Sequence, residues 1–154
     1  MISIRHRKTG VLLHAVNAAT LAGAPLASAR LAGADLPFAV LFGADLRGSD
    51  LQDATLSNAD LTDARMQRSD LRCASLRGSD LRRADLTEAN LEGADLADAN
   101  LSGALLSGAS LESTTFTGVI LSDATFDITT HWPRGLDPKR YGARRIPERH
   151  DPPE

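Results

Sequence analysis

The sequence predicts an all-β solenoid, a stack of short coils that share one buried core. Its leucines recur every five residues, and the positions from Leu21 to Phe126 hold 19 leucines in 22 consecutive units without an insertion. The position two residues before each of these centres is alanine in 17 units. Only 4% of the residues are aromatic although 42% are hydrophobic, so we expect an aliphatic core.

A period of five residues fits neither an α-helix nor a straight strand. On a helix, five residues advance about 140° beyond a full turn, so the leucines would be spread around the cylinder. On a strand, an odd period sends successive leucines to opposite faces. If the chain turns a corner after each unit, however, every leucine and every small residue can face a common axis. Coils stacked in this way bury what one coil leaves exposed, and alanine fits because a narrow tube has no room for more.

The repeat units resemble those of the pentapeptide-repeat protein family. Residues 44–48 read ADLRG and residues 94–98 read ADLAD, close to the A[DN]LxG pattern of that family. The resemblance covers about 110 of the 154 residues. It implies a right-handed quadrilateral parallel β-helix over residues 19–128, with about five and a half coils of four units each. At the usual strand spacing of about 4.8 Å, such a rod is roughly 26 Å long.

The two ends of the chain are predicted to close the solenoid. Residues 1–18 read as an N-terminal strand or hairpin cap, with two alternating strands around Lys8-Thr9-Gly10. Residues 129–154 read as a C-terminal plug and flexible tail, which we expect to be disordered from about Pro147. The segment THWPRGLDP resembles the WPxGFDP-like tail that follows the repeats in many bacterial family members. The residues expected to plug the last coil are Trp132, Leu136 and Tyr141, of which Leu136 replaces the usual phenylalanine.

The N-terminus and the cysteine content indicate a cytoplasmic protein, and the family resemblance implies a bacterial one. Residues 5–29 imitate a secretory signal, but His14 and Asn17 interrupt the apolar run, and the leucine register has begun by Leu21. Cys73 is the single cysteine, so an internal disulfide is excluded and a reducing compartment fits. No apolar run approaches the length that spans a membrane, and we expect no membrane partner.

Charge is distributed unevenly along the chain. Residues 19–128 carry 16 acidic side chains and 8 arginines, whereas the first 18 residues carry +3 and the last 26 carry +2. The net charge of −3 argues against a general nucleic-acid binder, so no direct nucleic-acid contact is expected.

Eight aspartates and two asparagines stand directly before the repeat centres, in a phase that points outward. Repeated carboxylates suggest metal ligands or a catalytic pair, but the same position also takes threonine, arginine, serine and leucine. A residue that helps to turn each corner explains this variation better. The four histidines are scattered over the end segments, and Walker, GxSxG, HExxH and CxxC motifs are absent. We therefore expect no catalytic residue, no metal and no cofactor.

Six arginines cluster within about one coil length. At twenty residues per coil, four of them fall beside acidic residues of neighbouring coils: Arg65 between Asp45 and Asp85, Arg68 beside Glu88, Arg72 beside Glu92, and Arg83 beside Asp63. Such cross-coil pairs contribute well under ~1 kcal/mol each at a surface. Arg77 and Arg82 have no partner in this register. They are therefore candidates for contact with a partner, and the band as a whole could instead bind phosphate or an acidic protein.

A few apolar side chains also point outward by phase. Phe38, Val40 and Phe42 lie next to one corner of the early coils, where they form a docking patch or are covered by the N-terminal cap. Leu105 and Ile120 are expected to lie beneath the C-terminal plug. Cys73 is outward as well and is interpreted as an incidental surface thiol.

These observations favour a non-enzymatic scaffold that mediates protein–protein interaction, since a tube filled by leucine and alanine leaves no pocket for catalysis. Its partner is an unknown protein, and the chain is a monomer or a homodimer. The alternative, which the family resemblance implies, is a DNA-mimicking modulator of a type II topoisomerase (gyrase), as is thought of members that protect against fluoroquinolones. Two features count against this alternative: the arginine band interrupts the acidic columns, and the proline-rich tail lacks the apolar stripe of a helical dimerisation module. The predicted partner-binding residues are Phe38, Val40, Phe42, Arg77 and Arg82.

Overall fold

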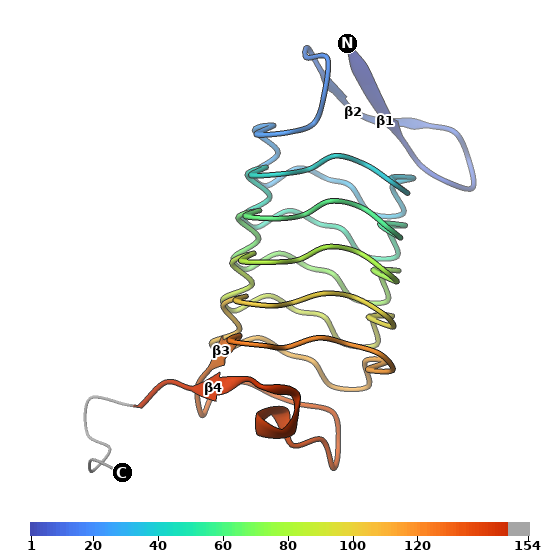
Figure 1. The fold of residues 1–154 in the computed structure, drawn as a ribbon. Coiled ribbons are helices and arrows are strands. Elements are labelled where there is room, and N and C mark those ends of the chain that lie inside the picture. The colour runs from blue at the N-terminus through green and yellow to red at the C-terminus, as the bar shows by residue number, and fades with distance from the viewer. Residues whose placement is uncertain (148–154) are drawn as a thin grey trace.

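Residues twenty positions apart lie side by side in the computed structural model, which describes residues 1–147. Isolated parallel bridges join them from Pro25↔Asp45 to Leu105↔Thr125, so each coil contains four five-residue units. Figure 1 shows the resulting stack, with the hairpin at one end and the C-terminal segment at the other. The parallel stack and its four units per coil confirm the predicted quadrilateral parallel β-helix, whereas its handedness and number of coils stay predictions. None of the described helices is long and apolar enough to cross a bilayer.

Each unit turns its corner in the same way, as residues 61–65 illustrate. The Ala64 N–H donates to the Leu61 carbonyl at 3.0 Å, which closes a four-residue turn. Asp63, the third residue of this turn, has φ 56°, as type II turns require at that position. Glycine adopts this conformation without steric cost, but twelve residues other than glycine also adopt it in the repeat. Packing of the stack therefore imposes the turn even where the local residue opposes it.

The core is a double row of leucines and small residues that run the length of the tube. Every repeat leucine from Leu41 to Leu111 is fully buried, and so is Met66. Serine or threonine replaces alanine at four buried positions, and in each case the hydroxyl donates to the carbonyl three residues earlier, as Ser69 does to Met66 at 2.8 Å. A small polar residue is thus tolerated in the tube because its turn supplies an acceptor.

The N-terminal hairpin consists of β1 (Ile2–Arg5) and β2 (Leu12–Val16), which pair antiparallel. Ile4 points into the core and is buried. The hairpin joins one side of the first coil through backbone hydrogen bonds from Asp35 N–H to the Arg5 carbonyl and from Arg7 N–H to the Gly33 carbonyl, both 2.9 Å. It therefore covers the Asp35 side of the stack.

The C-terminal segment adds a strand to the last coil. β3 (Thr125–Phe126) pairs parallel with β4 (Arg144–Arg145), and the 3-10 helix η1 (Pro138–Tyr141) lies before β4 in the chain. Trp132 makes edge-on contacts with Phe116 and Phe126, at ring centroid distances of 6.0 and 5.4 Å. Tyr141 contacts Phe116, and Leu136 is partly buried. The tail predicted to be disordered from about Pro147 lies almost entirely outside the described residues.

Candidate functional site

The twenty-residue coil brings all five predicted partner-binding residues to one side of the stack. We call this surface the Val40 side, after the column of outward residues at its middle: Val40, Asp60, Asp80, Asn100 and Ile120. Phe38 and Arg77 belong to the turns that bound it on one edge, and Phe42 and Arg82 to the turns on the other. Residues that are up to 44 positions apart in sequence therefore form one surface.

The N-terminal end of the Val40 side is apolar and accessible. Phe38 is 72% exposed, Val40 51% and Phe42 48%, so the alternative that the cap covers them is wrong. The hairpin leaves them free because it pairs with the adjacent Asp35 side. Phe38 also has φ 58°, in the left-handed region that a bulky residue rarely adopts. The turn itself does not need phenylalanine, since Asn58 and Gly78 occupy the equivalent position in the next coils.

Farther along the Val40 side, ion pairs occupy the surface. Arg77 pairs with Asp98 at 3.0 Å, and Arg82 pairs with Asp80 at 2.6 Å. Neither arginine has an acidic partner twenty positions away, as predicted, but both are paired in the structure. The prediction considered only straight cross-coil neighbours, whereas Arg77 reaches a residue 21 positions away and Arg82 turns back to its own unit.

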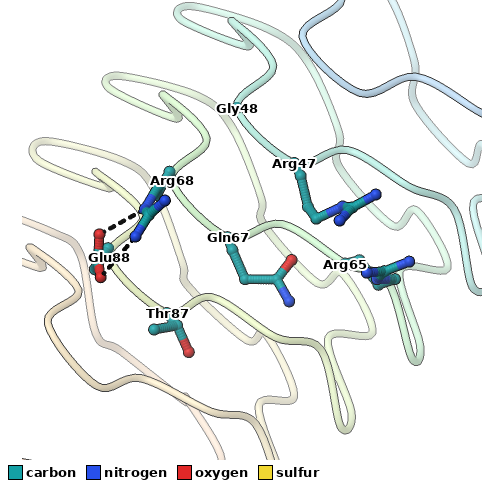
Figure 2. Close-up of a pocket in the computed structure, with 7 residues that line it drawn as sticks. All are labelled: Arg47, Gly48, Arg65, Gln67, Arg68, Thr87 and Glu88. Carbon is teal, nitrogen blue, oxygen red and sulfur yellow. Dashed lines mark hydrogen bonds and ion pairs between the residues drawn. The ribbon is translucent and has the colours of Figure 1, made fainter.

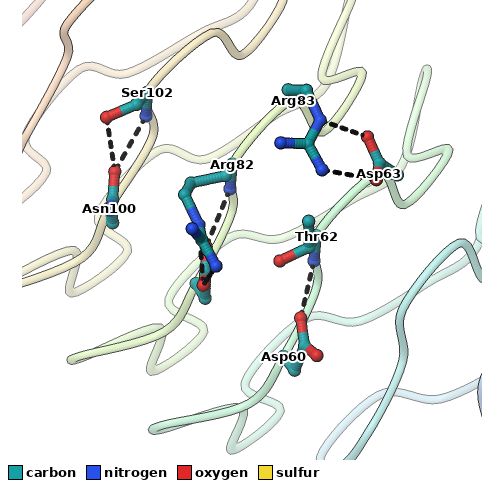
Figure 3. Close-up of polar contacts among 8 residues, drawn as sticks. Asp60, Thr62, Asp63, Arg82, Arg83, Asn100 and Ser102 are labelled. Carbon is teal, nitrogen blue, oxygen red and sulfur yellow. Dashed lines mark hydrogen bonds and ion pairs between the residues drawn. The ribbon is translucent and has the colours of Figure 1, made fainter.

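The cross-coil register predicts two of the remaining arginine pairs correctly but not the pairing of Arg72 or Arg65. The Arg68–Glu88 pair at 2.7 Å and the Arg83–Asp63 pair at 2.8 Å confirm the cross-coil register, and Figure 3 shows the second of them. Arg72 pairs instead with Asp70, at 2.6 Å, rather than with Glu92. Within residues 1–147, the Arg65 side chain makes neither an ion pair nor a hydrogen bond.

The outward aspartates have a structural function in the turns. In Asp60, Oδ1 accepts a hydrogen bond from the Thr62 N–H at 3.1 Å (Figure 3). The N–H two residues after the aspartate forms no backbone hydrogen bond in these turns, so the side chain supplies its acceptor. This contact supports the corner-turning interpretation over metal binding or catalysis. The side chains that accept in this way are Asp45, Asp50, Asp60, Asp70, Asp80, Asp85, Asn90, Asp95 and Asn100.

Asp95 provides a clean test of this contact, because it forms no ion pair with an arginine among the described residues. Its Oδ1 accepts from the N–H of the buried Ala97 at 3.0 Å. We expect Asp95→Ala to lower the free energy of unfolding by about 1 kcal/mol, because the buried N–H loses its acceptor. Asp95→Asn keeps an acceptor and should be nearly neutral. Urea unfolding followed by circular dichroism compares the three proteins, and equal losses in both variants would contradict the explanation.

Arginine contacts also set the pKa of several carboxyl groups. The hydrogen bond from the Arg47 side chain lowers the pKa of Asp45 to about 2. Hydrogen bonds from arginine side chains likewise lower the pKa of Asp63, Asp70, Asp80 and Glu88.

We therefore expect an acid-dependent loss of stability that depends on Arg47. Because the folded pKa of Asp45 lies below the unfolded value near 3.9, its contribution is complete above about pH 4 and is lost toward about pH 2. The pair is partly exposed, so solvent screening keeps this contribution small. Arg47→Met should be less stable than the parent at neutral pH, and the difference should shrink as the pH falls. A difference in urea unfolding that does not change with pH would contradict this prediction.

An arginine-lined groove on the next side of the stack was not predicted. It has a volume of about 450 Å³ and is lined by Arg47, Arg65, Arg68, Gln67 and Glu88, together with Gly48 and Thr87 (Figure 2). The sequence did contain a signal for this groove, because positions 48, 68 and 88 are twenty residues apart and therefore lie beside one another. Asp45 and Glu88 pair with two of its three arginines, so the groove is not a strongly positive anion site.

Leu105 and Ile120 are exposed, at 42% and 47%, so the prediction that they lie beneath the plug is wrong. The C-terminal aromatic residues close the end of the tube by packing on Phe116 and Phe126, and they leave the sides uncovered.

Comparisons with known proteins agree with this architecture. The family model for pentapeptide repeats matches residues 19–58, 49–87 and 84–123. The crystal structure of alr5209, a pentapeptide repeat protein from Nostoc, shares 39% identity and covers 66% of this chain and 84% of its own, with a TM-score of 0.65. The pentapeptide repeat protein Rfr23 from Cyanothece shares 33% identity and covers 58% of this chain and 61% of its own, with a TM-score of 0.58.

The similarity to one further solved structure is too distant to indicate function. QnrB1, a plasmid-mediated fluoroquinolone resistance protein, shares 17% identity and covers 79% of this chain and 77% of its own, with a TM-score of only 0.44. No curated protein sequence matches the chain significantly. The matched repeats and the two cyanobacterial structures show that the chain belongs to the pentapeptide-repeat protein family.

Proposed function

We propose that this protein is a non-enzymatic scaffold that binds a partner protein through the Val40 side. The observation that carries the proposal is the exposed apolar cluster of Phe38, Val40 and Phe42. Phe38 occupies this position although its exposure and its left-handed backbone both disfavour a large aromatic residue. Exposed aromatic residues of this kind are typical anchors of protein interfaces.

The rest of the Val40 side suits the rim of such an interface. Its ion pairs, Arg77–Asp98, Arg82–Asp80 and Arg83–Asp63, are partly exposed and surround the polar middle column. Rim charges of this kind contribute more to specificity and association rate than to affinity. The tube behind them is filled by leucine and alanine and leaves no interior space for a substrate.

The alternative is that the protein modulates a type II topoisomerase (gyrase) by imitating duplex DNA. A DNA mimic presents regular columns of unpaired negative charge. Here, Asp63, Asp80 and Asp98 on the Val40 side are paired with arginines, and Asp45 and Asp70 are paired on other sides. This neutralisation favours the scaffold over the DNA mimic.

The family resemblance and the single cysteine support two further proposals. We propose a right-handed coil with about five and a half turns, and we place the protein in the cytoplasm, where Cys73 would stay reduced.

An affinity capture from the lysate of the native host tests the proposed function. The baits are the parent protein, Phe38→Ser/Phe42→Ser, Arg77→Glu/Arg82→Glu, and a control with Leu105→Ser/Ile128→Ser, which removes exposed apolar side chains outside the Val40 side. We expect one protein to be captured by the parent and the control and to be lost from the phenylalanine variant. The arginine variant should weaken its capture. Enrichment of gyrase or topoisomerase IV subunits would favour the alternative, and equal capture by all baits would contradict the proposal.

A further inference from the structure

The backbone of Val40 lacks the neighbours that its equivalents have in later coils. In the next coil, the Asp60 N–H donates to the Ala39 carbonyl at 2.9 Å, and the Asp60 carbonyl accepts from the Leu41 N–H at 2.8 Å. The Val40 N–H and carbonyl form no such bonds within residues 1–147. The segment before the first coil forms the hairpin, which lies at this end of the stack (Figure 1), so no complete earlier coil pairs with Val40. Val40 therefore presents an unpaired strand edge.

An apolar groove lies beside this edge. Its volume is about 370 Å³, and its walls include Ile2 and Ile4 of β1, Leu21, Leu36 and Val40. Asp35 also lines it, and among the described residues the Asp35 carboxylate forms neither an ion pair nor a hydrogen bond. The groove thus combines apolar walls with one uncompensated negative charge.

The other sides of the first coil lack this combination. The hairpin pairs with the Asp35 side through Arg5. Pro25 has no N–H to offer, which is a common way to block a strand edge. Arg30 has an unpaired N–H and carbonyl in the described structure but does not line the groove.

We propose that a short extended segment of the partner protein adds to the Val40 edge as a β-strand. Its backbone would bond to the Val40 N–H and carbonyl, its alternate apolar side chains would enter the groove, and a lysine or arginine would face Asp35. Strand addition of this kind takes its affinity from main-chain hydrogen bonds and its specificity from pockets for alternate side chains. The proposal rests on the proposed function and specifies the chemistry of the partner.

Val40→Pro is the decisive variant, because it removes the N–H donor. Proline is tolerated at this position of the repeat, as Pro25 shows in the same coil. Arg30→Pro is the matched control, since it removes an equivalent N–H from the same coil outside the groove. Thermal unfolding verifies that both variants keep the stability of the parent.

The probe is a synthetic peptide that alternates valine and threonine and carries a lysine at each end. Binding is followed by amide chemical shifts of isotopically labelled protein and by hydrogen exchange of the Val40 amide. We expect a Kd below about 1 mM, shift changes centred on the groove, and slower exchange at Val40. Val40→Pro and N-methylation of the peptide should each weaken binding at least about tenfold, or 1.4 kcal/mol. Arg30→Pro should bind like the parent, and replacing the lysines by glutamates should weaken binding.

Four outcomes would overturn the inference: no binding in this range, equal binding by Val40→Pro, shift changes centred elsewhere, or a parent dimer that Val40→Pro converts to a monomer. The last result would identify a second copy of the chain as the occupant. Lysate capture separates the two proposals. A partner lost from Phe38→Ser/Phe42→Ser but retained by Val40→Pro would overturn strand addition and leave the proposed function standing. A partner that all baits retain would overturn the proposed function itself.

Discussion

Replacing Leu71 by alanine is expected to lower the free energy of unfolding by about 3 to 4 kcal/mol. Leu71 is fully buried, and it lies between Leu51 and Leu91 of the neighbouring coils. Its own N–H is bonded to the Asn90 carbonyl at 2.7 Å, so the backbone cannot close in on the cavity. A cavity that cannot collapse costs the lost contacts as well as the lost transfer free energy. Urea unfolding followed by circular dichroism measures the change.

Leu105→Ala is the matched control for this experiment, because it is the same substitution at a repeat position that points outward. Leu105 is exposed, so the change should stay within about 0.5 kcal/mol of the parent. A loss at Leu105 as large as that at Leu71 would show that the two side chains are packed alike, and it would contradict the phase of the repeat.

The repetitive part of this fold could be predicted from the sequence because each unit imposes the same constraint as the next. The five-residue period alone identified the buried positions, and Leu71 and Ala74 lie where the period places them. The twenty-residue coil, taken from the family resemblance, then predicted neighbours across coils, and Arg68 meets Glu88 as that spacing requires.

The departures from prediction concern what the repeat does not constrain, namely long side chains and the end segments. A register fixes Cα positions, but a long arginine side chain can reach a diagonal neighbour or its own unit, as Arg77 and Arg82 do. The end segments do not repeat, so nothing in the period could place the hairpin relative to Phe38 or the plug relative to Ile120.

The candidate site likewise has a part that the repeat predicts and a part that it does not. The outward phase of Phe38 and Phe42 could be read from the sequence, and their position on the same side as Arg82 follows from the coil length. The unpaired edge at Val40 could not be predicted, because it arises where the chain passes from the hairpin into the stack. The proposed strand-addition site thus lies at the boundary between the repeat and the N-terminal cap.

Replacing Ala84 by leucine is expected to lower the free energy of unfolding by about 3 kcal/mol, the upper part of the range for overpacked cores. Ala84 is fully buried, and leucine already fills the positions beside it at Leu81 and Leu86. The coils cannot move apart to make room, because backbone hydrogen bonds such as Asp85 N–H to the Ala64 carbonyl, at 2.9 Å, join them.

Ala84→Ser is the control for this prediction, since serine occupies the equivalent position at Ser79 and donates to the carbonyl three residues earlier at 2.7 Å. It should cost less than about 1 kcal/mol, because the Leu81 carbonyl offers the same acceptor. A tube that accepted leucine as easily as serine would have unfilled space beside its axis. Such space could hold a small ligand, and the function would then not be confined to the outer sides of the tube.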